Sequence, residues 1–78
     1  MGMSQEEILG FLREKYGVDP SKFYHPKNIA QGLNRSETSV KNRLAKLLKH
    51  GEVEPRTEDA HKRVLYRYNP TPEERVNA

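Results

Sequence analysis

The stretch SETSVKNRLAKLLKHG, residues 36–51, decides the fold of this chain. Its apolar residues recur at the i, i+4, i+7 and i+8 spacing of one helix face, at Val40, Leu44, Leu47 and Leu48. Ser36 is a favourable N-cap, and Gly51 is a typical residue just past a helix C-terminus. We therefore predict a helix over residues 36–50 whose apolar stripe belongs to the core.

Two shorter helices are predicted upstream. Ser4 and Glu7 form a capping box before an apolar stripe that reaches Tyr16, and Gly17 then offers a stop, which together predict a helix over residues 4–16. Pro26 suits the first turn of a second helix over residues 26–33, because its missing N–H is not needed there. Between the two helices we predict a turn at residues 19–21 and a minimal strand at residues 23–25.

After Gly51 the apolar period changes from 3.6 to 2. Val53 lies on one side of a polar stretch, residues 56–62, and Val64, Tyr66 and Tyr68 alternate on the other. This pattern predicts two short strands joined by a charged loop. Pro55 cannot donate a ladder hydrogen bond, so its strand is expected to be an edge strand or to be irregular at that point. We expect an α+β domain over residues 1–68 and a flexible tail over residues 69–78, which has two prolines and little to bury.

Composition limits what the protein does. The 78 residues suffice for one domain, and 33% hydrophobic against 32% charged residues, with a mean hydropathy of −1.01, indicate a small core. Without cysteine there is no disulfide, thiolate metal site or cysteine nucleophile. No apolar run approaches the about 20 residues that span a membrane, and no signal peptide is evident, so we expect a cytoplasmic protein without membrane contact.

The charge is distributed unevenly along the chain. The formal net charge is +3, but residues 1–34 sum to zero. Residues 35–67 carry nine basic and five acidic residues, a local excess of four positive charges. Such an excess indicates a surface for a polyanion, although a solvated surface of mixed charge gives the same count.

The order of helix, short strand, helix, tight turn, helix and hairpin carries a resemblance. The stretch at residues 29–36, followed by SVKNRL at residues 39–44 and Gly51-Glu52-Val53, resembles the core pattern of winged helix-turn-helix transcription regulators. ArsR-like, MarR-like and archaeal repressor-like families share that pattern. The resemblance implies sequence-specific binding of double-stranded DNA, with helix 36–50 in the major groove and the hairpin as a wing. Glu52 departs from it, because such regulators usually carry a bulky apolar residue there, and we expect a looser junction between helix and hairpin.

Helix geometry assigns roles to the polar residues opposite the stripe. The predicted base-reading residues are Thr38, Ser39, Asn42, Arg43 and Lys46, since amide and guanidinium groups match base edges. The predicted backbone contacts, at helix starts or on the flanks, are Lys27, Arg35, Ser36, Lys41 and Lys49. The predicted wing contacts are Arg56, His61, Lys62 and Arg63.

Other functions receive less support. The three histidines lie on separate elements without a partner at ligand spacing, no serine has a base beside it, and no glycine-rich phosphate loop is present. We therefore expect no metal, no cofactor and no enzymatic activity. Two alternatives stay open: a winged helix that serves as a protein-interaction module in a multisubunit assembly, and a protein that binds RNA or single strands. Regulators of this kind often pair to read two half-sites, so a homodimer is a further expectation, and the sequence leaves the choice between monomer and dimer open.

Overall fold

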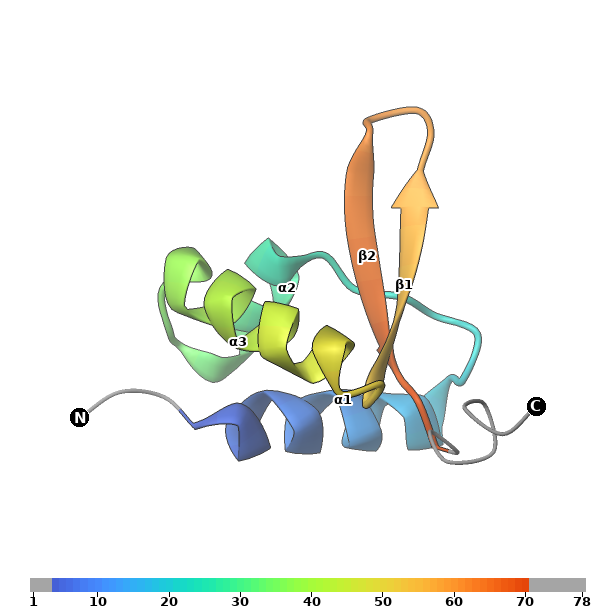
Figure 1. The fold of residues 1–78 in the computed structure, drawn as a ribbon. Helices are drawn as coiled ribbons and strands as arrows, with labels where there is room; N and C mark the ends of the chain where they lie inside the picture. The colour runs from blue at the N-terminus through green and yellow to red at the C-terminus, as the bar shows by residue number, and fades with distance from the viewer. Residues whose placement is uncertain (1–3, 71–78) are drawn as a thin grey trace.

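The computed structural model describes residues 4–70, and it is an α+β structure of three helices and one antiparallel hairpin (Figure 1). The elements follow the chain as α1 (Gln5–Val18), α2 (Pro26–Leu33), α3 (Glu37–Lys49), β1 (Val53–Glu58) and β2 (Arg63–Tyr68). The helices form a body with α1 along one side, and the hairpin projects from that body (Figure 1). This confirms the predicted order of elements. Most of the predicted tail, residues 71–78, lies outside the described residues.

Helix α3 has the ends that its sequence predicts. The Ser39 N–H donates to the Ser36 hydroxyl at 3.2 Å, and Gly51 follows the helix with a φ of 74°. Within the stripe, Val40, Leu44 and Leu47 are fully buried, but Leu48 is 38% exposed. The prediction that Leu48 belongs to the core is therefore wrong. Helices α1 and α2 both pack on α3, and Leu48 lies about 100° around the helix from Leu47, beyond the surface that they cover.

Helix α1 runs past its predicted end. Gly17 remains helical, and the helix ends only where Asp19 becomes extended, with a φ of −149°. The reason is the next residue, because Pro20 disfavours the helical conformation at the residue before it. The predicted turn at residues 19–21 is confirmed: the Ser21 hydroxyl and N–H donate to the Asp19 carboxylate at 2.7 and 3.1 Å. These two bonds lower the pKa of Asp19.

The core lies where the three helices meet the base of the hairpin. Its fully buried side chains include Ile8 and Leu12 of α1 and Ile29 of α2, which join the α3 stripe, and Val53 adds the first residue of β1. Gly32 lets α1 and α2 approach closely, since a Cβ there would lie 2.6 Å from the ring of Phe11. The helical body therefore depends on a small set of close contacts.

The predicted strand at residues 23–25 is a single bridge. Tyr24 and Tyr66 exchange two backbone hydrogen bonds of 2.8 Å, while His25 already caps α2 by accepting from the Lys27 N–H at 3.0 Å. Because Tyr66 directs its N–H and C=O toward Tyr24, its pairing with Pro55 on the other side is of the type without hydrogen bonds. Pro55 therefore loses nothing by lacking an N–H, and β1 is the edge strand that its presence predicts.

The hairpin is longer than predicted. Strand β1 continues to Glu58, so Arg56 lies within the strand and only residues 59–62 form the turn. The register runs from Val53 opposite Tyr68 to Glu58 opposite Arg63, and it places one apolar residue, Leu65, among the charged residues of the outer face. Pairing rather than hydropathy therefore determines where the strand ends. Lys62 closes the turn with a φ of 52°, in the left-handed region.

The junction between α3 and the hairpin is held by residue 69. Asn69, which we expected in the flexible tail, is 3% exposed. Its N–H donates to the Glu52 carbonyl at 3.0 Å and its side-chain amide donates to the Gly51 carbonyl at 2.8 Å. The Glu52 N–H in turn donates to the Leu47 carbonyl at 3.0 Å. These backbone bonds secure the junction without an apolar residue at position 52, so the looser junction expected from Glu52 is not seen.

The fold predicts a contrast between two neighbouring leucines of α3. Leu44→Ala removes a fully buried side chain and should lower the free energy of unfolding by about 2–5 kcal/mol. Leu48→Ala is the matched control and should cost less than about 1 kcal/mol, because Leu48 is already 38% exposed. Urea denaturation followed by circular dichroism measures both. Equal losses for the two variants would contradict this core.

Candidate nucleic-acid interface

Helix α3 presents a polar face on the side opposite its core stripe. Five exposed residues form this face, and each has either a short polar or a cationic side chain: Thr38, Ser39, Asn42, Lys46 and Lys49. Ala45 lies among them and adds little bulk. Arg43 differs from the other predicted base readers because its side chain is half-buried, and it also interacts within the fold. The structure thus brings four of the five predicted base-reading residues to one open face.

Three of the predicted backbone contacts are already engaged. Arg35 pairs with Glu7 of α1 at 3.0 Å, and Lys41 pairs with Glu37 one turn away at 3.2 Å. The Ser36 hydroxyl serves as the N-cap of α3 and also donates to the Ser39 hydroxyl at 2.9 Å. The Lys41 pair has the i,i+4 spacing of neighbours on one helix face, whereas 28 positions separate Arg35 from Glu7, so no local pattern indicates the Arg35 pair.

The cations near α1 lie over aromatic rings. Arg13 lies 5.4 Å from the ring centroid of Tyr68, Lys15 lies 5.4 Å from that of Phe11, and Lys22 lies 5.5 Å from that of Tyr24. At these distances a cation is attracted to the face of the ring. These three positive charges are therefore directed back onto the fold.

Four lysines have no such contact. Within residues 4–70, Lys27, Lys46, Lys49 and Lys62 are exposed and make neither an ion pair nor a ring contact. Lys27 starts α2, Lys46 and Lys49 lie on α3, and Lys62 lies in the hairpin turn. The positive charges that remain available to an external anion are therefore spread from α2 across α3 to the hairpin tip.

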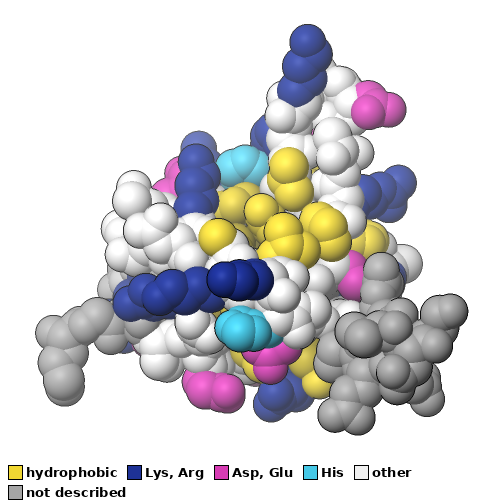
Figure 2. All heavy atoms as spheres, viewed as in Figure 1, with side chains coloured by type: hydrophobic (Ala, Val, Ile, Leu, Met, Phe, Trp, Pro, Cys, Tyr) yellow, Lys and Arg dark blue, Asp and Glu magenta, His cyan; other side chains and the backbone are white. Residues whose placement is uncertain are grey.

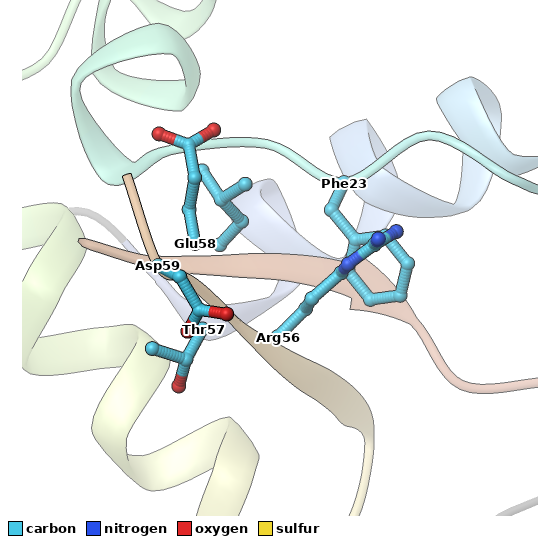
Figure 3. Close-up of a pocket in the computed structure, with 6 residues that line it drawn as sticks. Phe23, Arg56, Thr57, Glu58 and Asp59 are labelled. Atoms are coloured by element: carbon cyan, nitrogen blue, oxygen red, sulfur yellow. The ribbon is translucent and has the colours of Figure 1, made fainter. Parts of the chain in front are cut away.

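On the face of the hairpin that points away from the helices, the charged side chains contact one another and the segment after α1. Arg67 pairs with Glu54 on the neighbouring strand, donates to the Pro20 carbonyl at 2.6 Å and lies 4.6 Å from the ring centroid of Phe23. Arg56 lies over the same ring at 5.6 Å (Figure 3). An open pocket of about 400 Å³ lies here, lined by Phe23, Arg56, Thr57, Glu58, Asp59 and Leu65. The predicted wing residue Arg56 thus points away from α3, because position 56 alternates with the positions that face the helices.

The tip of the hairpin is an ion-pair cluster around Glu58. Arg63 donates to the Glu58 carboxylate through Nε at 3.1 Å and Nη2 at 2.7 Å, and the His61 Nε2 lies 3.9 Å from the same oxygen. The hydrogen bond from Arg63 is the main reason that the pKa of Glu58 is lowered from its ordinary value. Of the predicted wing contacts, Arg63 is therefore paired with Glu58, His61 lies near the same carboxylate, and Lys62 makes neither an ion pair nor a ring contact among residues 4–70.

Apolar side chains lie in the space between α3 and the hairpin. Figure 2 shows hydrophobic atoms gathered there, beside the basic side chains of α3. Leu48 and Val64 are 38% and 40% exposed, and Ala45 and Pro55 are exposed as well. Val64 alternates with Tyr66 and Tyr68, which pack on the core, so it lies on the side of the hairpin that faces the helices. We call these four residues the apolar notch; its exposure was not foreseen from the sequence.

No group of three potential metal ligands is found among residues 4–70. None of the three described helices is long and apolar enough to cross a membrane. Comparison of the chain with protein-family profiles, with curated proteins and with solved structures gave no match.

The lowered pKa of Glu58 predicts how the hairpin tip responds to pH. The ordinary pKa is 4.5 and the folded value lies below it, so the pair with Arg63 stabilises the fold above about pH 5 and this contribution disappears as the pH falls through the folded pKa. Glu58→Gln removes the carboxylate at every pH. The difference in unfolding free energy between wild type and Glu58→Gln should therefore close as the pH falls from about 7 to about 2.

Glu14→Gln on the exposed side of α1 is the control. Glu14 makes no hydrogen bond or ion pair among the described residues, so its variant should lack the pH-dependent difference from the wild type. If the difference in unfolding free energy between the wild type and Glu58→Gln persists unchanged at the lowest pH, the lowered pKa of Glu58 is not the cause.

Proposed function

We propose that this chain is a winged helix-turn-helix protein that binds double-stranded DNA and regulates transcription. Helices α2 and α3 are the helix-turn-helix, with α3 as the reading helix, and the β1–β2 hairpin is the wing. The observation that supports this most is the arrangement of the contact-free lysines: Lys27, Lys46, Lys49 and Lys62 all lie on α2, α3 or the hairpin turn, and none lies on α1.

The electrostatic argument depends on which cations are already paired. A phosphate that approaches Arg35 or Arg63 has to compete with a carboxylate of the fold, whereas one that approaches a contact-free lysine only displaces water and counterions. Helix α1 carries three glutamates against two basic residues, whereas α3 carries four basic residues against Glu37 alone, so the positive charge is concentrated on α3. That distribution supports contact between this basic surface and the phosphate backbone of one DNA duplex.

The exposed face of α3 supports base reading. An α-helix fits the major groove, which is about 12 Å wide, when its leading side chains are small. Thr38, Ser39 and Asn42 are small and exposed in the N-terminal half, and Asn42 is suited to the bidentate contact with adenine. Lys46 follows one turn later and suits guanine. Arg43 is assigned a lesser role than the sequence implied, because it is half-buried and engaged.

One observation favours the alternative of a protein-interaction module. Exposed apolar residues such as Leu48 and Val64 are expected on a protein-binding surface. On this chain, however, the apolar notch borders the basic face of α3 rather than standing apart from it (Figure 2). A surface that is both apolar and basic favours a nucleic-acid strand, which carries sugars and phosphates side by side.

The lysines give a direct test of DNA binding. A double variant, Lys46→Gln with Lys49→Gln, should weaken binding to a labelled duplex of about 20 base pairs roughly tenfold and lower the salt slope by about two, because two phosphate contacts are lost. Fluorescence anisotropy at several salt concentrations measures both quantities. The matched control, Lys15→Gln with Lys22→Gln, changes the net charge equally on the α1 side and should alter affinity much less. Absence of duplex binding by the wild type at low salt would refute the proposal.

Base reading has its own test. Asn42→Ala should relax the base preference at one position of the selected site by about 1–3 kcal/mol while leaving affinity for mixed-sequence DNA nearly unchanged. Selection from a random duplex library compares the variant with the wild type. Lys49→Ala is the control and should weaken binding to all sequences alike, because its ammonium group has no ion pair within the described residues and is placed to contact phosphate. If Asn42→Ala leaves the base preference unchanged, Asn42 does not read a base.

A further inference from the structure

Strand β1 has one edge that no other strand covers within residues 4–70. The sheet holds β1 and β2 alone, and β2 is flanked on its other side by Tyr24, which exchanges two backbone hydrogen bonds with Tyr66. The free edge of the hairpin is therefore the outer edge of β1 (Figure 1). An open edge is a template on which a strand of another molecule can add, and proteins that keep one usually block it.

The register determines which backbone groups of β1 face this open edge. In an antiparallel pair, residues that exchange hydrogen bonds alternate with residues whose N–H and C=O point outward. The Asn69 N–H donates to the Glu52 carbonyl at 3.0 Å, so residue 52 directs its carbonyl toward the second strand. Tyr66, in contrast, directs its N–H and C=O away from Pro55 and toward Tyr24. Both observations give the same set of outward-facing residues in β1: Val53, Pro55 and Thr57.

Pro55 is the middle member of this outward-facing set. A strand that adds to the edge bonds to outward-facing residues two positions apart, so any ladder that uses two neighbouring members of the set includes position 55. Proline has no N–H to donate, and its ring carbon occupies the place of the missing hydrogen. Pro55 is exposed, so no other part of the described fold already covers this point. One proline therefore interrupts every such ladder along β1.

We infer that Pro55 closes the edge of β1 to strand addition, and that the strand it excludes is β1 of a second copy of this chain. Two copies present the same outward-facing set, so a two-fold axis could pair their edges in antiparallel fashion, as isologous interfaces do. The proline prevents this pairing, and a homodimer of the chain has to use another surface. This inference concerns the hairpin alone and does not depend on DNA binding.

Pro55→Thr opens the edge and is the first test. Threonine restores an outward-facing N–H, and its branched side chain suits a strand. Sedimentation equilibrium should give an association constant at least about tenfold above that of the wild type, because two hydrogen bonds across the two-fold axis become possible. Hydrogen exchange locates the contact: the Thr57 N–H should become more protected as the concentration of this variant rises.

Exchanging the two residues provides the matched control. The double variant, Pro55→Thr with Thr57→Pro, has the composition of the wild type and moves the proline to another outward-facing position. Thr57 pairs with Val64 without hydrogen bonds, so a proline there breaks no bond inside the hairpin. With the edge interrupted again, the association constant should return to the wild-type value. Circular dichroism and thermal unfolding verify that both variants fold, and Pro55→Thr against the wild type decides the question if the double variant does not.

The outcomes separate clearly. Association of Pro55→Thr with protection at Thr57, absent from the wild type, supports the inference. Three results overturn it: Pro55→Thr associates no more than the wild type, the double variant associates as strongly as Pro55→Thr, or the wild type itself shows protection at Thr57 that grows with concentration. Duplex binding by the wild type is a separate measurement, so failure of the proposed function leaves this result standing.

Discussion

Two backbone hydrogen bonds between Tyr24 and Tyr66 determine how the hairpin sits on the helical body. They join the segment before α2 to β2, which thereby lies between that segment and β1. The same bonds leave Pro55 in a pair that needs no N–H, so a proline is tolerated in the strand. The rings reinforce this attachment, since Tyr24 meets Phe11 at 6.2 Å and Tyr68 meets Tyr16 at 5.7 Å, each edge to face. Because the base of the hairpin is held in this way, the space between it and α3 has a defined shape.

Arg67 secures the opposite face of the hairpin. Its guanidinium joins Glu54, the Pro20 carbonyl and the ring of Phe23, and so ties both strands to the turn after α1. A planar guanidinium with five donors can make such contacts together, whereas an ammonium group cannot stack and bridge in the same way. The positive charge of Arg67 therefore stabilises the fold. Other cations, such as those of α3 and the hairpin turn, remain exposed at the surface.

The candidate site was predictable in outline and not in detail. Helical periodicity identified the exposed face with Thr38, Asn42 and Lys46, because that face depends only on the angular position of each residue. It gave no means of separating Lys49, which has no contact within residues 4–70, from Arg35, which pairs with Glu7. Both are basic residues at a helix end or just outside one. Their difference arises from a carboxylate brought near by the packing of α1.

The sequence by itself determined the order and type of the elements, the caps of α3 and the buried positions Val40, Leu44 and Leu47. These features depend on local spacing and backbone chemistry, which a single chain segment contains. Only the tertiary structure decided that Leu48 is exposed, that Asn69 belongs to the folded domain, that Arg56 and Arg63 are held on the hairpin and that an apolar notch separates it from α3. Each of these depends on which distant segment lies alongside, and the free energy of such contacts is set by three-dimensional packing rather than by neighbours in the sequence.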